Sequence, residues 1–171
     1  MNPTTIKSLD DVTLDPLNAN AGNAEGRAMI AASLSRFGAG RSILLDKHGT
    51  VIAGNKTVEQ ARAAGMTKIR VVQSDGTGLV AVQRTDLDLT VDGTARALGI
   101  ADNRTAEVDL TWDPTVLEQL RKDDPDALAG LFTDAEVAEL VAEALRDAEP
   151  SDVDAPAQVE AGVELRKKWG T

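Results

Sequence analysis

The hydrophobic core of this chain has to be built almost entirely from aliphatic side chains. Aromatic residues make up 2% of the 171 positions, with two Phe, two Trp and no Tyr, and there is no cysteine. Disulfides, cysteine-ligated zinc and thiol catalysis are therefore excluded, and the single histidine, His48, leaves no histidine cluster for a metal. This length suits one ordinary domain with an appendage.

Charge divides the chain into two unequal parts. Residues 1–100 hold 11 Lys+Arg and 10 Asp+Glu, whereas residues 101–171 hold 7 and 18. The acidic C-terminal part repels a polyanion, so charge favours a small anionic ligand on the N-terminal part over nonspecific binding of a DNA duplex. No apolar run approaches the roughly 20 residues that span a bilayer, and the N-terminus lacks the pattern of an export signal. We expect a cytoplasmic protein without membrane contact.

The order of predicted elements indicates a mixed α/β (α+β) fold. Apolar residues at helical spacing, together with glycine stops and capping residues, predict helices over 25–36, 56–64 and 93–103, from Pro114, and after the capping box at Thr133. Strand-like runs at 42–46 and 50–53, joined by a turn containing Gly49, predict a hairpin. Further extended segments or strands are expected at 6–9, 12–14, 68–72 and 79–84.

Two glycine-containing segments are candidate anion sites. Gly38-Ala39-Gly40-Arg41-Ser42 joins a predicted helix to a strand, and its glycines let backbone N–H groups approach an anion while Arg41 adds charge. Gly54-Asn55-Lys56-Thr57 joins a strand to a helix, which places free N–H groups, an ammonium and a hydroxyl where phosphate is favoured. A phosphate pocket between the two segments is the resulting hypothesis.

Each segment also has a plain structural interpretation. The first is then a helix stop followed by a turn, and the second a helix cap with a solvated Lys56. A Walker-type phosphate loop is rejected, because Asn55 stands at the position of its lysine. Asp86, Asp88 and Asp92 are either a site for a hard cation or a solvated acidic loop.

In their order along the chain, these two segments and Ala101-Asp102-Asn103-Arg104 resemble the motifs of the ParB family. In that family a helix and glycine turn lead into a strand, a hairpin ends in a Gly-Glu-Arg-Arg motif that opens a helix, and a Glu-Asn motif lies downstream. Asn55, Lys56 and Thr57 stand here in place of Glu-Arg-Arg. The resemblance implies a ParB N-terminal-like domain with a small mixed sheet, flanking helices, helical C-terminal additions and an acidic tail.

The same resemblance implies that the three segments surround a nucleoside triphosphate, CTP in the partition proteins, with Mg²⁺. The nucleotide-binding residues would be Gly38, Gly40, Arg41, Ser42, Gly54, Asn55, Lys56, Thr57, Asp102, Asn103 and Arg104. Sulfiredoxin shares the fold, but its chemistry needs a cysteine that this chain lacks.

A variant of the family that accompanies phage and prophage DNA methyltransferases is more similar still, since there Asp-Asn-Arg is followed by Trp-Asp, as at Trp112-Asp113. Residues 164–170 resemble the stretch that leads into the methyltransferase. The expected organisation is a ParB-like domain over 1–110, a helical extension over 111–147 and an acidic linker or tail over 148–171.

The leading functional hypothesis is a nucleotide-binding accessory domain that regulates or assists a DNA methyltransferase, with indirect contact to DNA and a homodimer as one option. A nucleotide-hydrolysing or phosphoryl-transfer enzyme, in which Lys56 and Arg104 neutralise phosphate charge, is the alternative. A ParB-like DNA nuclease is the third.

Overall fold

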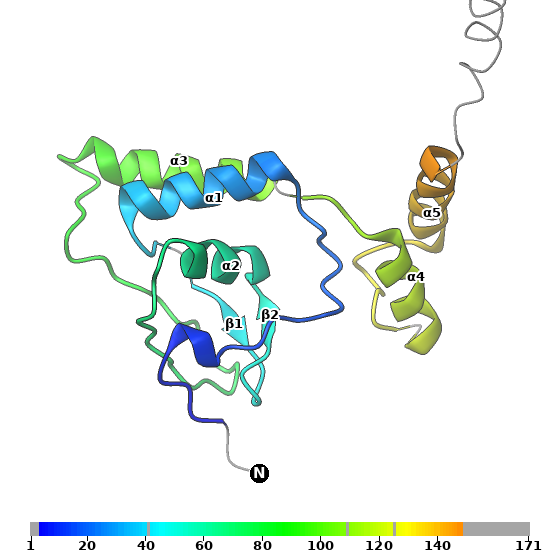
Figure 1. Cartoon of the computed structure of the whole chain (residues 1–171), viewed down its shortest axis with the longest axis horizontal. Helices are drawn as coiled ribbons and strands as arrows, with labels where there is room; N and C mark the ends of the chain where they lie inside the picture. Colours follow the sequence, from blue (N-terminus) through cyan, green and yellow to red (C-terminus); the bar gives the residue numbers. More distant parts are fainter. Residues whose placement is uncertain (1–3, 41, 109, 125, 149–171) are drawn as a thin grey trace, which may run out of the picture. The chain divides into compact units, whose positions relative to one another are not determined.

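The computed structural model describes residues 4–40, 42–108, 110–124 and 126–148. Within these ranges the chain forms helices and one small sheet, so the predicted mixed α/β class is confirmed (Figure 1). The chain divides into two compact units, Met1–Val116 and Leu117–Thr171, slightly after the boundary expected at residue 110. The motif at 164–170 and, apart from Ala148, the expected tail at 148–171 lie outside the described residues.

The helices lie where the sequence predicts them, with small shifts at most ends, but the helix that begins at Gly93 continues to Val108, past its predicted end at 103. The elements are, in order, η1 (Leu9–Asp11), α1 (Ala24–Phe37), β1 (Leu44–Leu45), β2 (Val51–Ala53), α2 (Asn55–Ala63), α3 (Gly93–Val108), α4 (Pro114–Asp123) and α5 (Asp134–Ala148). Local signals explain their starts. The Asn23 side chain accepts a hydrogen bond from Gly26 N and begins α1, and the Asp113 side chain accepts from Thr115 N at 2.9 Å and begins α4.

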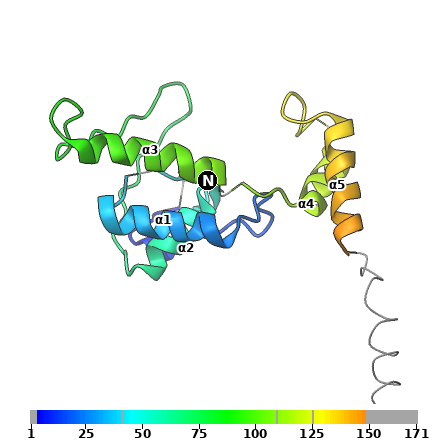
Figure 2. The same cartoon turned by 90° about the horizontal axis from the view of Figure 1, so that it is seen from above.

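The aliphatic core of the first unit lies between η1, α1, α2 and the hairpin. Its buried members are Leu9, Val12, Ile30, Leu34, Val51, Val58 and Ala61. Ile30 and Leu34 are four residues apart on α1, so both face α2. α1 also packs against α3, and Figures 1 and 2 show these two helices side by side. α1 is therefore the element that holds α2 and α3 in one unit.

The sheet is smaller than expected. β1 and β2 pair antiparallel, with Leu44 opposite Ala53 and Leu45 opposite Val51. This confirms the predicted hairpin. Thr13 makes an isolated parallel bridge to Thr50, in which Val51 N donates to Thr13 O at 2.8 Å. The expected mixed sheet is thus an antiparallel pair with one parallel bridge beside it.

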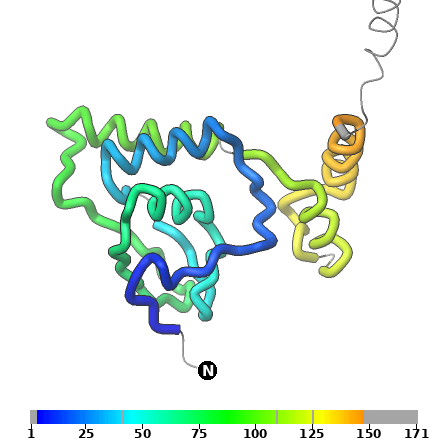
Figure 3. Tube along the Cα trace, viewed as in Figure 1, coloured from blue at the N-terminus to red at the C-terminus, as the bar shows by residue number. Residues whose placement is uncertain are grey.

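The strands predicted at 68–72 and 79–84 are wrong. Both segments lie in the long connection from α2 to α3, which Figure 3 shows as an irregular trace, and neither carries regular secondary structure. Val72, Leu79 and Val82 are 61%, 99% and 65% exposed. Alternating β-branched residues favour a strand locally, but a strand needs a partner edge, and the described residues offer none here.

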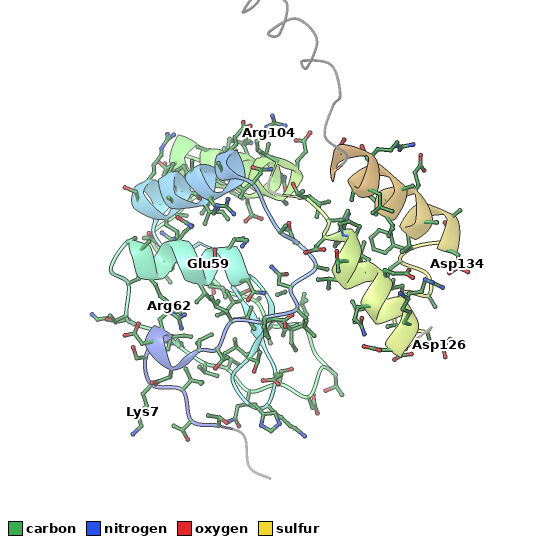
Figure 4. The ribbon with its side chains drawn as sticks, turned by 45° about the vertical axis from the view of Figure 1, so that its right-hand side comes forward. Lys7, Glu59, Arg62, Arg104, Asp126 and Asp134 are labelled. Carbon is green, nitrogen blue, oxygen red and sulfur yellow. The ribbon has the colours of Figure 1, made fainter. Side chains whose placement is uncertain are left out.

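Arg62 ties the N-terminal turn to α2. Its guanidinium donates to the carbonyl of Leu9 at 2.8 Å and to the carbonyl of Val12, and Figure 4 shows it on α2 next to that turn. The first carbonyl belongs to η1, where it also accepts from Val12 N at 3.2 Å, and the second belongs to Val12, the residue that ends η1. The Arg62 side chain therefore stabilises the fold by linking α2 to the N-terminal turn, although its buried Nε has no hydrogen-bond partner among the described residues.

The second unit is organised by the predicted capping box. Thr133 N donates to the Glu136 carboxylate at 2.7 Å, and Glu136 N donates to Thr133 Oγ1 at 3.2 Å. These bonds from Thr133 hold the pKa of Glu136 below its usual value. Leu117, Leu128 and Val137 are buried in this unit. In the described part of the chain, no helix combines the length and apolar character needed to cross a membrane.

Candidate functional site

The glycine turn after α1 brings its backbone close to α3. Gly38 ends α1 with φ +71°, and its N–H donates to Leu34 O at 3.0 Å. A Cβ on Gly40 would lie 3.0 Å from Leu98 Cδ1, so the backbone at Gly40 lies directly against the Leu98 side chain. Ser42 is exposed, and Arg41 lies outside the described residues.

The start of α2 is occupied by the chain itself. Gly54 has φ +103°, and a Cβ there would lie 2.7 Å from Ile43 Cγ2, so Ile43 covers this position. Asn55 is only 5% exposed, and its side-chain oxygen accepts a hydrogen bond from Asp15 N at 2.9 Å. Lys56 Nζ is 3.3 Å from Glu59. These contacts are structural, but no side chain of the described residues caps α2 and Lys56 is paired with Glu59, so the plain interpretation as a side-chain cap with a solvated Lys56 is wrong.

The space between the two glycine segments is small. A cavity of about 20 Å³ is lined by residues of α1 and α3 and by Gly38, Gly40 and Thr57. This volume holds about one water molecule and no phosphate group. The turn and the start of α2 are therefore neighbours, as expected, but they enclose no room for a ligand.

A much larger groove shares Gly40 and Asp102 with this cavity. It measures about 700 Å³ and is bounded by the glycine turn, the connection before α3, and α3 itself. Its lining residues are Gly40, Ser42, Arg84, Leu87, Leu89, Ala95, Leu98, Gly99 and Asp102. The groove thus combines a backbone turn, a hydroxyl, a cation and a carboxylate with a set of aliphatic side chains.

Arg84 is held in place on the groove wall. Its Nη1 donates to Phe37 O at 3.0 Å, while Nε and Nη2 donate to the two carboxylate oxygens of Asp86 at 2.8 and 2.6 Å. The hydrogen bonds from Arg84 lower the pKa of Asp86 to about 2, and the same pair raises the pKa of Arg84. The guanidinium is therefore permanently charged and fixed in orientation.

The helical geometry of α3 makes the residues of the third motif, Asp102-Asn103-Arg104, point in different directions. Asp102 lines the groove, whereas Asn103 and Arg104 are exposed and are not among the lining residues. Consecutive helical residues point about 100° apart, so Asn103 and Arg104 turn away from the direction in which Asp102 points. Arg104 Nη1 lies 2.8 Å from Glu107, which raises the pKa of Arg104, and Figure 4 shows Arg104 pointing outward from α3.

The structure therefore gathers only part of the predicted set. Gly40, Ser42 and Asp102 line the groove, Gly38 and Thr57 line the small cavity beside it, and Gly54, Asn55, Lys56, Asn103 and Arg104 line neither. Arg84 and Gly99 also line the groove, and neither was predicted from the sequence. A glycine inside a predicted helix was a usable signal for Gly99, because such a glycine needs a packing or functional reason. Nothing in the local sequence distinguished Arg84.

The remaining candidates stay separate from the groove. His48 is exposed in the hairpin turn. Asp88 accepts from Thr90 Oγ1 at 2.6 Å and Asp92 accepts from Thr94 N at 2.7 Å, while Asp86 pairs with Arg84. Across the described ranges, no group of three or more acidic, His or Cys side chains is arranged to hold a metal ion. The acidic loop is thus organised by local turn contacts.

Comparison with family models, curated proteins and solved structures gives no match.

Proposed function

We propose that the N-terminal unit binds a nucleoside triphosphate in the groove beside α3, as an accessory domain of the ParB-like type. One observation carries the proposal: Gly40 and Ser42 from the first motif and Asp102 from the third line a single groove, together with Arg84. These residues are distant in the sequence, and a common lining gives the motif order a physical meaning.

The groove has the size and chemistry for such a ligand. Its volume of about 700 Å³ falls inside the range of about 300–1,000 Å³ that is typical of small-molecule sites. The Arg84 guanidinium and the Ser42 hydroxyl suit phosphate oxygens. Leu87 and Leu98 provide aliphatic surface for a base or sugar. An anionic ligand also agrees with the charge of residues 1–100, where basic and acidic groups nearly balance.

The residues of this groove are compatible with a Mg²⁺ ion bound together with the nucleotide. Mg²⁺ is commonly held by one or two carboxylates together with substrate phosphates, and it keeps several waters. Asp102 supplies one carboxylate to the groove. The ion would neutralise phosphate charge next to this acidic side chain, so affinity for a triphosphate should depend on it.

Binding is favoured over phosphoryl transfer. The enzyme hypothesis needs Lys56 and Arg104 to neutralise charge on the phosphates, yet neither residue lines the groove. Both already form ion pairs, with Glu59 and Glu107. Arg84 alone is a weak basis for stabilising a transferring phosphoryl group, which usually receives several charged contacts.

Calorimetric titration of the full chain with each of the four ribonucleoside triphosphates, with and without Mg²⁺, tests this proposal. We expect one nucleotide to bind with a Kd below about 1 mM. Ser42→Ala and Asp102→Asn should weaken binding, whereas Lys56→Ala and Asn103→Ala, outside the groove, should leave it within about twofold. If none of the four nucleotides binds, the proposed function is rejected.

A DNA methyltransferase is the partner that the motif order favours. The sequence Asp102-Asn103-Arg104 with Trp112-Asp113 supports this part of the proposal, since it resembles the methyltransferase-associated variant. The methyltransferase encoded in the same reading frame or next to it should copurify with the chain, and nucleotide should change its affinity for DNA. If no methyltransferase is encoded there, the partner is wrong and nucleotide binding remains to be judged by calorimetry.

A further inference from the structure

Gly99 lies in the interior of α3 without an internal reason to be glycine. Glycine in the middle of a helix is less favourable than alanine, because it loses more backbone freedom on folding. A Cβ built on Gly99 meets no atom of the described residues within 4 Å. Gly40 and Gly54 differ, because a Cβ there would approach Leu98 to 3.0 Å and Ile43 to 2.7 Å. Within the described residues, the packing requires glycine at Gly54 and crowds a Cβ at Gly40, whereas it sets no such limit at Gly99.

The open side of Gly99 is the groove. Ala95, Leu98, Gly99 and Asp102 follow one another at spacings that put them on one face of α3, and all four line the groove. Gly99 leaves a bare strip of helix backbone on this face. Such a strip is what a helix offers when another group has to approach its backbone closely.

Arg84 stands on the same groove with unused hydrogen-bonding capacity. A guanidinium has five N–H donors, and the contacts to Phe37 and Asp86 use three of them. The side chain is 27% exposed and lines the groove. Because Phe37 and Asp86 already fix its orientation, Arg84 loses little side-chain freedom when it contacts an anion.

From these observations we infer that Arg84 and Gly99 are the two residues that define the ligand of the groove. Arg84 contacts the phosphate, and Gly99 is the floor against which the base or sugar lies, beside Leu98. The assignment deepens the proposed function and rests on it for the identity of the ligand as a nucleotide. It also transfers the cationic role in binding from Lys56 and Arg104 to Arg84.

Gly99→Leu tests the floor, with Gly93→Leu as the matched control. Gly93 also lies on α3 with open space around its Cβ, but it does not line the groove. We expect Gly99→Leu to weaken binding of the nucleotide and of its nucleoside at least about tenfold by steric exclusion, with an unchanged or higher Tm. Gly93→Leu should bind like the wild type. A purely structural glycine would instead lower Tm on replacement, so Tm and affinity together separate the two roles.

Arg84→Gln tests the cation, with inorganic triphosphate and the nucleoside as separate probes. We expect affinity for nucleotide and for inorganic triphosphate to fall at least roughly tenfold, while affinity for the nucleoside stays within about twofold. Asp86→Asn is the control for the ion pair, since it removes the carboxylate and keeps the guanidinium. It should weaken nucleotide binding less than Arg84→Gln does.

The outcomes distinguish this inference from the proposed function. A wild-type chain that binds no nucleotide overturns both. Nucleotide binding that survives Gly99→Leu rejects the floor and leaves the proposed function intact. Equal losses for Arg84→Gln and Asp86→Asn reject Arg84 as a phosphate contact, because the ion pair would then act only through the fold.

Discussion

The start of α2 and the middle of α3 both present glycine, yet the two places are opposites. At Gly54 the backbone has φ +103° and Ile43 leaves no room for a Cβ. At Gly99 the space is open and faces a groove of about 700 Å³. The sequence motif directs attention to the first place, whereas the unfilled volume lies at the second. A glycine in a motif is thus informative only when the space around it is known.

Replacing Gly54 should produce the largest loss of stability. Gly54→Ala adds a Cβ 2.7 Å from Ile43 Cγ2 at a left-handed φ, and we expect the free energy of unfolding to fall by about 2–3 kcal/mol. Urea denaturation measures this. Adding Ile43→Ala to Gly54→Ala should recover the part of this loss in unfolding free energy that comes from the clash, but not the part that comes from the left-handed φ. If Ile43→Ala recovers none of the lost stability, the clash is contradicted. An unchanged stability for Gly54→Ala would remove the contrast with Gly99.

Removing the buried amide of Asn55 should have the next largest effect. Asn55→Ala leaves Asp15 N without its acceptor, and we expect a loss of about 1–2 kcal/mol in the free energy of unfolding. Asn103→Ala, at an exposed position on α3, should change stability by less than about 0.5 kcal/mol. Equal effects of the two substitutions would show that the hydrogen bond from Asp15 N to Asn55 does not stabilise the fold.

At Gly99 the same kind of substitution should raise stability instead of lowering it. Gly99→Ala adds a methyl group into open space and restores helix propensity, so we expect the free energy of unfolding to rise by about 0.5–1 kcal/mol. Thermal denaturation checks this, with Gly54→Ala measured in parallel. A loss of stability would mean that Gly99 is needed by the fold, and the two glycines would then be alike.

The smallest expected effect is the pH dependence of the stability that the Arg84–Asp86 pair contributes. Because Arg84 lowers the pKa of Asp86 from 3.8 to about 2, this pair favours the folded state above pH 3.8, and its contribution is lost as pH falls through about 2. A ¹³C NMR titration of the Asp86 carboxyl should show this midpoint. In Arg84→Gln the midpoint should return toward 3.8, and an unchanged midpoint would exclude the pairing with Arg84.

Prediction from sequence succeeded where the signal was local. The Thr133 capping box, the hairpin around Gly49 and the helix stop at Gly38 all depend on residues a few positions apart, and the structure contains each of them. It failed for 68–72 and 79–84, because alternating residues describe a strand's faces and say nothing about a neighbouring edge. The site falls between these cases, since Gly40, Ser42 and Asp102 line the groove but Arg84 and Gly99 were not predicted.

By itself the sequence determined the fold class, the positions of the helices, an aliphatic core and a separation of charge, because these follow from spacing, composition and the contacts of near neighbours. Only the tertiary structure decided which glycine is covered and which is open. Ile43 reaches Gly54, no side chain in the described ranges reaches Gly99, and a carbonyl at the end of α1 orients Arg84. Such contacts join residues that are distant in the chain, and no local pattern specifies them.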